Sequence, residues 1–124
     1  MEGASLLRVR DALLTIRCGA VCSEERLHEL TACALAEAGM DARHEVRLAP
    51  RCRIDFLVGN VGIEIKKNKP DRTKLIAQLE RYAACEQVEA LLVVAPRGVR
   101  LPKSIHGKQV SMLALESLWG ISLP

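Results

Sequence analysis

Residues 53–67 read RIDFLVGNVGIEIKK, and this stretch decides the fold because it has the pattern of two β-strands joined by a tight turn. Gly59 and Asn60 form a two-residue hairpin signal. On either side of them, apolar residues alternate with polar or small ones, which is typical of strands. The stretch therefore predicts a β-hairpin.

The length of the turn fixes which residues face each other across this hairpin. If Val58 faces Val61, then Asp55 lies directly opposite Glu64. Side chains alternate between the two faces of a strand, so each face can be predicted. The polar face is expected to carry Arg53, Asp55, Glu64 and Lys66, and the apolar face Ile54, Phe56, Val58, Val61, Ile63 and Ile65.

Two facing acids on one hairpin are an electrostatic conflict, because directly opposed side chains on a sheet lie only about 4.5–5.5 Å apart. A hard divalent cation relieves this conflict, and Mg²⁺ or Mn²⁺ suits carboxylate oxygens. Lys66 could then help to activate a water molecule. The alternative is a solvated charged surface, since Glu-x-Lys arises by chance in a chain with 18 basic and 15 acidic residues. The opposed Asp55 and the apolar opposite face favour a metal site.

The composition indicates one domain, spanning residues 1–124, in a chain that is 49% hydrophobic. The longest wholly apolar run, 90–95, is too short to cross a membrane, so no membrane association and a cytoplasmic location are expected. The odd count of five cysteines argues against a disulfide framework, and reduced thiols are expected. Cys18 and Cys22 are the only closely spaced pair, which disfavours a zinc or iron–sulfur site.

Positive charge gathers around the acidic pair. Residues 43–74 hold nine Arg or Lys against four Asp or Glu, in a chain whose net charge is +3. Such a surface favours a polyanion as partner, although a solvated charged rim is the alternative. The expected contacts with nucleic acid are Arg51, Arg53, Lys67, Lys69, Arg72 and Lys74. Because aromatic residues are few, extensive base stacking is not expected.

Hydrophobic periodicity predicts the other elements. Helices are expected over 4–17, over 24–38 with Ser23 as N-cap and Gly39 as stop, and from Pro70 or Asp71 to about residue 86. Further strands are expected over 44–48, 90–95 and 109–115, followed by a short helical turn around Trp119. The predicted class is α/β, with a mixed sheet flanked by helices.

The apolar faces of two predicted helices have expected roles. The apolar face of the N-terminal helix, called here the N-terminal stripe, consists of Leu6, Val9, Leu13 and Ile16. We expect it to pack on its own domain or, alternatively, to form a homodimer surface. Packing on its own domain is the favoured reading. The core stripe of the second helix is Leu27, Leu30, Ala34 and Ala38, which leaves His28 and Glu29 on a flank.

In these features the chain resembles the PD-(D/E)xK nuclease superfamily, particularly the RecB-type nucleases and the archaeal-type Holliday junction resolvases. The resemblance covers residues 23–95, where Ile-Asp55-Phe and Ile-Glu64-Ile-Lys66 match the acidic positions and the lysine of the motif. The proline of the namesake motif is replaced by Ile54. The resemblance implies a restriction-endonuclease-like αβββαβ core, preceded here by an extra N-terminal helix.

Gln78 and Tyr82 reproduce the QxxxY spacing of the RecB-type members on the expected helix. The resemblance also implies one more metal ligand on the first core helix. His28 fits that position best, with Glu25 and Glu29 as alternatives, and Glu45 in the preceding strand is a weaker candidate.

The resemblance implies metal-dependent hydrolysis of DNA phosphodiester bonds, with RNA as an alternative substrate. Asp55, Glu64 and the carbonyl of Ile65 are expected to hold Mg²⁺ or Mn²⁺, and Lys66 to assist the attacking water. Gln78 and Tyr82 are expected to steady Lys66 or a substrate phosphate. The competing hypothesis is a module that binds nucleic acid or protein on a nuclease fold without cutting.

Overall fold

The computed structural model describes residues 5–18 and 22–118. Within them the chain forms three α-helices and a six-stranded mixed sheet, which confirms the α/β class. The elements are α1 (Leu6–Leu13), α2 (Glu24–Glu37), β1 (Ala42–Ala49), β2 (Cys52–Val58), β3 (Val61–Ile65), α3 (Arg72–Ala83), β4 (Ala90–Ala95), β5 (Ser104–Ile105) and β6 (Lys108–Ala114). A 3₁₀ turn, Leu115–Leu118, follows β6, whereas Trp119 lies outside the described residues.

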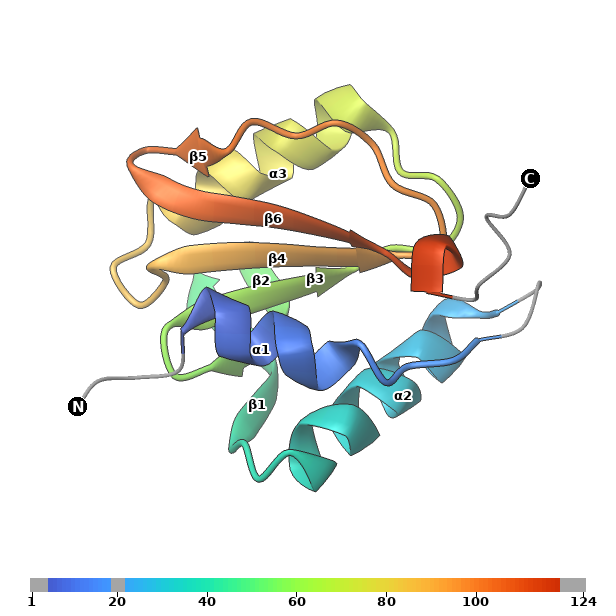
Figure 1. Cartoon of the computed structure of the whole chain (residues 1–124). Helices are drawn as coiled ribbons and strands as arrows, with labels where there is room; N and C mark the ends of the chain where they lie inside the picture. Colours follow the sequence, from blue (N-terminus) through green and yellow to red (C-terminus); the bar gives the residue numbers. More distant parts are fainter. Residues whose placement is uncertain (1–4, 19–21, 119–124) are drawn as a thin grey trace.

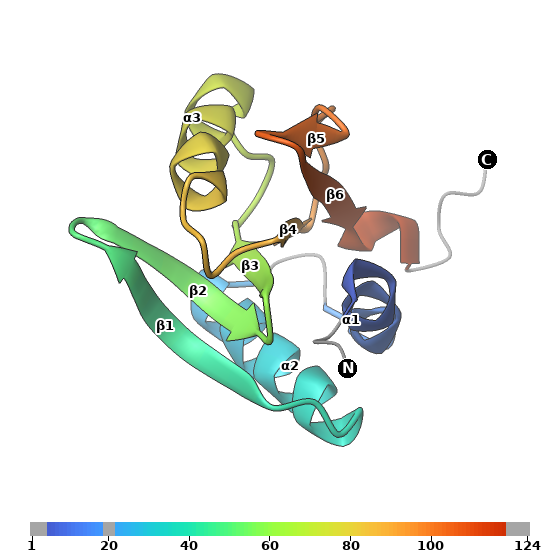
Figure 2. The same cartoon turned by 90° about the vertical axis from the view of Figure 1, so that its left-hand side faces the viewer.

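The sheet has the order β1-β2-β3-β4-β6-β5. β1, β2 and β3 are antiparallel neighbours, and α3 carries the chain across to β4, which runs parallel to β3. α1 and α2 lie against one face of the sheet and α3 against the other (Figures 1 and 2). The site residues of the hairpin therefore lie between two helical layers.

Each face of the sheet has its own buried core. The α2-side core comprises Val9, Leu13, Ile16, Leu27, Ala34, Leu35, Phe56, Val58, Val61, Ile63, Ile65, Ala90, Leu92, Val94, Leu113 and Leu115. The α3-side core comprises Leu48, Cys52, Ile54, Leu57, Leu75, Leu79, Tyr82, Ala83, Val88, Leu91, Val93 and Ile105. β4 contributes to both, and all of its residues are buried, as the apolar run predicts for a central parallel strand.

The helix caps follow the sequence signals. Ser23 accepts a hydrogen bond from the backbone N–H of Arg26, and Asp71 accepts one from that of Lys74. Gly39 follows α2 with φ +74°, the left-handed conformation that glycine adopts readily. The buried stripe of α2 differs from the prediction, because Ala38 is exposed and Thr31 and Leu35 are buried instead.

Several boundaries also differ from the predictions. α1 ends at Leu13, four residues before the expected end, and β3 ends at Ile65. α3 ends at Ala83, three residues before the expected end, and residues 84–89 form the turn into β4. β1 is longer than expected at both ends. β5 was not predicted; it is a two-residue strand that pairs with the start of β6 across a turn at His106 and Gly107, both of which have positive φ.

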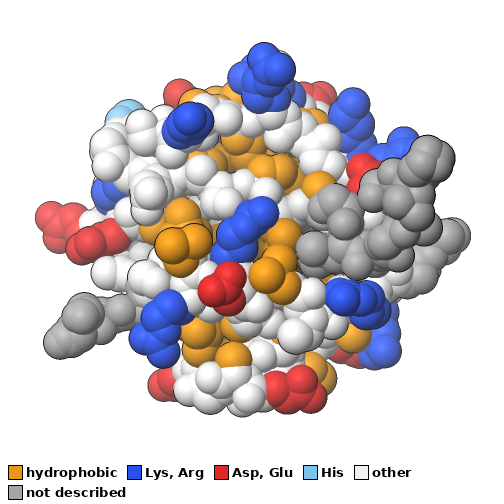
Figure 3. All heavy atoms as spheres, viewed as in Figure 1, with side chains coloured by type: hydrophobic (Ala, Val, Ile, Leu, Met, Phe, Trp, Pro, Cys, Tyr) orange, Lys and Arg blue, Asp and Glu red, His pale blue; other side chains and the backbone are white. Residues whose placement is uncertain are grey.

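The N-terminal stripe is used inside the chain. Val9, Leu13 and Ile16 are buried in the α2-side core, so the favoured reading is confirmed and these residues offer no homodimer surface. Leu7 and Leu14 are exposed on the other side of α1. The molecular surface on the side of α1 shows separate hydrophobic patches with charged side chains among them (Figure 3).

The expectation of reduced thiols is wrong for one pair. Cys18, after α1, and Cys22, before α2, form a disulfide with their Cα atoms 6.0 Å apart. Cys33, Cys52 and Cys85 are free. None of the described helices is long and apolar enough to cross a membrane.

Gly62 provides a test of the packing between the hairpin and β4. A Cβ atom at this position would overlap the Cδ1 methyl of Ile54 and lie 3.2 Å from Cδ2 of Leu91. We expect Gly62→Ala to lower the free energy of unfolding by about 1–2 kcal/mol, as overpacking in a core does. Urea unfolding followed by circular dichroism measures the change.

Ile54→Val is the matched background, because it removes the methyl group that a new Cβ would meet. In this background we expect Gly62→Ala to lower the free energy of unfolding by a smaller amount, with a coupling of about 1 kcal/mol between the two changes. If Gly62→Ala lowers the free energy of unfolding equally in both backgrounds, the packing described for Gly62 is contradicted.

Candidate metal and phosphate site

The candidate site lies where β2 and β3 separate. The predicted register is found at Val58–Val61, Leu57–Gly62 and Phe56–Ile63, but the ladder ends there. Asp55 and Glu64 lie one step beyond the last paired residues, so they are not paired in the ladder. β3 is paired with its parallel partner β4 along its whole length, and Glu64 pairs with Val93.

The side chain of Asp55 closes the opening between the two strands. Its Oδ2 accepts a hydrogen bond of 2.7 Å from the backbone N–H of Ile65. In a continued antiparallel ladder, a backbone carbonyl of β2 would take that place. The carboxylate thus substitutes for a strand contact, which holds it at the junction of β2 and β3.

β2 also changes face at Asp55. Ile54 belongs to the α3-side core, whereas Phe56 belongs to the α2-side core. The predicted apolar face is therefore wrong for Ile54. Strict alternation would have put both side chains on one face, so the change indicates a local twist of the strand at the acidic residue.

β1 follows the same distortion. His44 pairs with Phe56 and Val46 pairs with Ile54, but Glu45 between them has no ladder partner and takes φ +55°. A positive φ is unfavourable for a residue with a side chain and, where it persists, is held by its surroundings. The strained residue and Asp55 lie at the same level of the sheet.

Glu64 is the buried carboxylate of the site, with 5% of its surface exposed. Its Oε1 lies 2.8 Å from the hydroxyl of Tyr82, and its Oε2 lies 3.2 Å from Nζ of Lys66. Burial, followed by the charge of Asp55, raises the pKa of Glu64 to about 7, against an ordinary value of 4.5. Lys66 and Tyr82 oppose the shift without cancelling it.

Asp55 has the same tendency. Burial raises the pKa of its carboxyl, while the hydrogen bond from Ile65 and the proximity of His28 and Lys66 lower it. Both carboxyl groups of the site thus hold their protons more tightly than an ordinary carboxyl group does. This arrangement is the electrostatic conflict that the hairpin predicted, although the two strands have separated at this point.

Tyr82 and Gln78 act on Glu64. The Tyr82 hydroxyl accepts a hydrogen bond of 2.9 Å from Nε2 of Gln78, and it lies 2.8 Å from Glu64 and 2.9 Å from the carbonyl of Arg53. Burial and the charge of Glu64 raise the pKa of this hydroxyl, so it stays protonated and can donate. Because Tyr82 is 2% exposed, it positions Glu64 and cannot steady a substrate phosphate.

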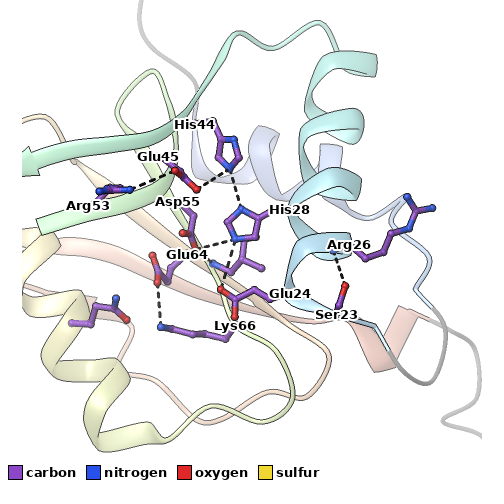
Figure 4. Close-up of polar contacts among 12 residues, drawn as sticks. Ser23, Glu24, Arg26, His28, His44, Glu45, Arg53, Asp55, Glu64 and Lys66 are labelled. Atoms are coloured by element: carbon purple, nitrogen blue, oxygen red, sulfur yellow. Dashed lines mark hydrogen bonds and ion pairs between the residues drawn. The ribbon is translucent and has the colours of Figure 1, made fainter.

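Helix α2 brings His28 to the same site (Figure 4). Its Nε2 lies 3.8 Å from Oδ2 of Asp55 and 3.9 Å from Oε2 of Glu24. Glu24 was not predicted as a site residue, because it was assigned only to the favourable first turn of the helix. One turn of α2 separates it from His28, a spacing that puts both side chains on one face and could have indicated it.

The other acids of α2 lie further out. Glu29 is exposed and pairs with Arg26 at 3.0 Å. Glu25 and Glu29 line a hollow of about 490 Å³ together with Glu24, His28, Ala32, His44 and Glu45. The structure brings neither of them to the carboxylates of the hairpin.

The basic residues divide into two groups. Arg53 pairs with Glu45 at 3.5 Å, and Nε of Arg72 donates to the carbonyl of Arg100 at 2.6 Å, so both are engaged within the chain. Arg51 is exposed in the turn between β1 and β2, and Lys69 is exposed after β3.

The second group borders the carboxylates. Lys66, Lys67 and Lys74 line a hollow of about 210 Å³ next to Gln78. Two acids, Glu24 and Asp71, also line it, and Asp71 accepts the N-cap hydrogen bond from the backbone N–H of Lys74. The hollow offers the ammonium groups of Lys67 and Lys74 to an anion, beside Lys66, which is paired with Glu64.

The donor set fits a hard divalent cation in its chemistry. Asp55 and Glu64 supply carboxylate oxygens, and their raised pKa values show that the chain itself does not fully compensate both negative charges. Within residues 5–18 and 22–118, no three His, Cys, Asp or Glu side chains are close enough to form a metal-binding group as they stand.

The chain matches no protein-family model, no curated protein and no solved structure. The resemblance to PD-(D/E)xK nucleases therefore rests on the residues quoted from the sequence.

The shifted pKa of Glu64 predicts how the stability of the metal-free protein depends on pH. A raised pKa means that the folded chain binds the proton more tightly than the unfolded chain. The free energy of unfolding should therefore fall as the pH rises from about 4.5 through about 7, by up to roughly 3 kcal/mol from this residue. Urea unfolding in the presence of a chelator measures the dependence.

Glu64→Gln keeps an acceptor for Tyr82 and removes the charge, so we expect it to flatten this dependence. Glu80→Gln on the exposed side of α3 is the matched control and should leave it unchanged. If the free energy of unfolding changes with pH equally in the wild type and in Glu64→Gln, the burial of an ionisable Glu64 is contradicted.

Proposed function

We propose that this protein is a divalent-metal-dependent nuclease that hydrolyses DNA phosphodiester bonds. The observation that carries the proposal is the pair of partly or fully buried carboxyl groups, Asp55 and Glu64, with the ammonium group of Lys66 at 3.2 Å from Glu64. The order of elements from α2 to β4 and the mixed sheet support a core of the restriction-endonuclease type.

In this proposal Asp55, Glu64 and the main-chain carbonyl of Ile65 hold one or two Mg²⁺ or Mn²⁺ ions, and His28 is the ligand from helix α2. When bound, the ion supplies Lewis acidity to the phosphate and lowers the pKa of a water molecule. A cation also favours the ionised form of Glu64, whose proton is otherwise retained near neutral pH.

The remaining side chains have separate tasks. Lys66 is partly exposed, with 29% of its side chain accessible, so its Nζ can reach both Glu64 and an approaching phosphate and offset the charge that develops there. Tyr82 and Gln78 fix the orientation of the Glu64 carboxylate from behind. These two are positioning residues.

The basic hollow supports a nucleic acid as substrate. Lys67 and Lys74 lie beside Lys66 and can bind backbone phosphates next to the reacting one. Phosphate contacts of this kind carry no sequence information, and the chain offers few aromatic side chains for stacking. We therefore propose recognition of the backbone, in duplex or branched DNA, with RNA as the alternative, by a protein located in the cytoplasm.

A second candidate function is a non-catalytic module that binds nucleic acid or protein. The observation that favours it is that no three potential ligands among the described residues are already close enough to hold a metal. The ion pair between Lys66 and Glu64 is compatible with this reading, because it partly neutralises the buried charge without a metal.

Cleavage assays separate the two functions. We expect the wild type to cut labelled DNA in the presence of Mg²⁺ or Mn²⁺, and Asp55→Asn and Glu64→Gln to lose at least about 100-fold in rate while remaining folded, because each removes a metal-binding charge. A panel of duplex, single-stranded and branched DNA and of RNA identifies the preferred substrate.

Glu80→Gln is again the matched control and should cut at the wild-type rate. Binding without cutting by the wild type would favour the non-catalytic module. Cutting by Asp55→Asn or Glu64→Gln at the wild-type rate would overturn the assignment of the site.

A further inference from the structure

His44 lies outside the acidic pair and has no role in the function proposed above. It is half-exposed on β1, and its Nε2 lies 3.0 Å from Nδ1 of His28 (Figure 4). At this distance the two ring nitrogens share one hydrogen bond, in which one ring donates and the other accepts. The direction of this bond decides what His28 presents on its opposite side.

We infer that His44 is a positioning residue: its Nε2 accepts the Nδ1 proton of His28 and so leaves the Nε2 lone pair of His28 directed at the metal site. The inference rests on the proposed function, because it concerns His28 as a ligand. A histidine that binds a metal through one nitrogen commonly donates from the other, and that second contact fixes its tautomer and orientation.

The spacing around Nε2 of His28 supports this direction. The nearest carboxylate oxygens, on Asp55 and Glu24, lie 3.8 and 3.9 Å away. These separations are too long for N–H···O hydrogen bonds, which lie near 2.7–3.2 Å. Nε2 of His28 therefore donates no hydrogen bond to either carboxylate, which is compatible with a lone pair on this atom.

The ring of His44 is held in place by its surroundings. It stacks on Phe56 with ring centroids 4.5 Å apart and an interplanar angle of 9°. Phe56 is 1% exposed, and it is also the ladder partner of His44 across β1 and β2. The bond to His28 therefore has a rigid support on the sheet.

The strained Glu45 completes the arrangement. Its Oε2 lies 4.0 Å from Nε2 of His44, and Arg53 lies 3.5 Å from its other oxygen. Arg53 offsets the charge that would otherwise disfavour a lone pair on His44. The twist of β1 at Glu45 places His44 on the same face as His28, opposite to Val46.

A pair of substitutions separates the acceptor from the packing. His44→Phe retains an aromatic ring against Phe56 and removes the acceptor, whereas His44→Gln retains an acceptor atom. We expect isothermal titration calorimetry with Mn²⁺ to show an affinity lower by about 10-fold or more for His44→Phe, and within about 3-fold of the wild type for His44→Gln. Circular dichroism verifies that both variants are folded.

A double-mutant cycle tests whether His44 acts through His28. In a His28→Ala background, His44→Phe should leave the Mn²⁺ affinity unchanged, because the ring that it orients is gone. An equal loss in both backgrounds, or an affinity of His44→Phe equal to that of the wild type, would overturn the inference.

The tautomer gives a readout independent of cleavage. In the Zn²⁺-loaded wild type at about pH 8, where an ordinary imidazole is neutral, ¹H–¹⁵N spectra should place the proton of His28 on Nδ1. His106, exposed in the turn between β5 and β6, is the internal control and should not respond to Zn²⁺. A proton on Nε2 of His28 would contradict the inference.

The two proposals fail in different ways. If the wild type binds Mn²⁺ and Glu64→Gln does not, while His44→Phe binds normally, the metal site stands and the role of His44 is wrong. If the wild type binds no Mn²⁺, the metal-dependent function itself is wrong, and the role of His44 falls with it.

Discussion

The structure depends on one electrostatic constraint, the placement of two carboxyl groups in a poorly solvated opening between β2 and β3. Asp55 bridges the strands through the backbone of Ile65, and Glu64 is enclosed by Tyr82 and Lys66. Burial and mutual repulsion make the fully ionised pair unfavourable. A cation that binds both groups would relieve this conflict, which is the basis of the metal site that we propose.

Much of the fold could be predicted from local patterns. The hairpin signal at Gly59 gave the correct register for three pairs, and the apolar run of β4 gave both of its ends. Ser23 and Asp71 marked the starts of two helices because a capping side chain satisfies the free N–H groups there. These features depend on neighbours in sequence, which is why the sequence alone contains them.

The rest depended on contacts between distant segments. Strict alternation predicted one face for Ile54 and Phe56, but the twist at Asp55 separates them, at the level where Glu45 of the neighbouring strand β1 has no ladder partner. The contact of His28 with His44 joins a helix to a strand that the sequence does not relate. The task of Tyr82 also became visible only from its burial against Glu64.

The most direct test of the central claim is proton release on metal binding. Titration of Mn²⁺ into the wild type at about pH 7, in two buffers with different heats of ionisation, gives the number of protons released. A group with a pKa of about 7 is half protonated at this pH, so the account predicts a release of about half a proton from Glu64, which Glu64→Gln abolishes. Absence of binding, or the same release in wild type and Glu64→Gln, would contradict it.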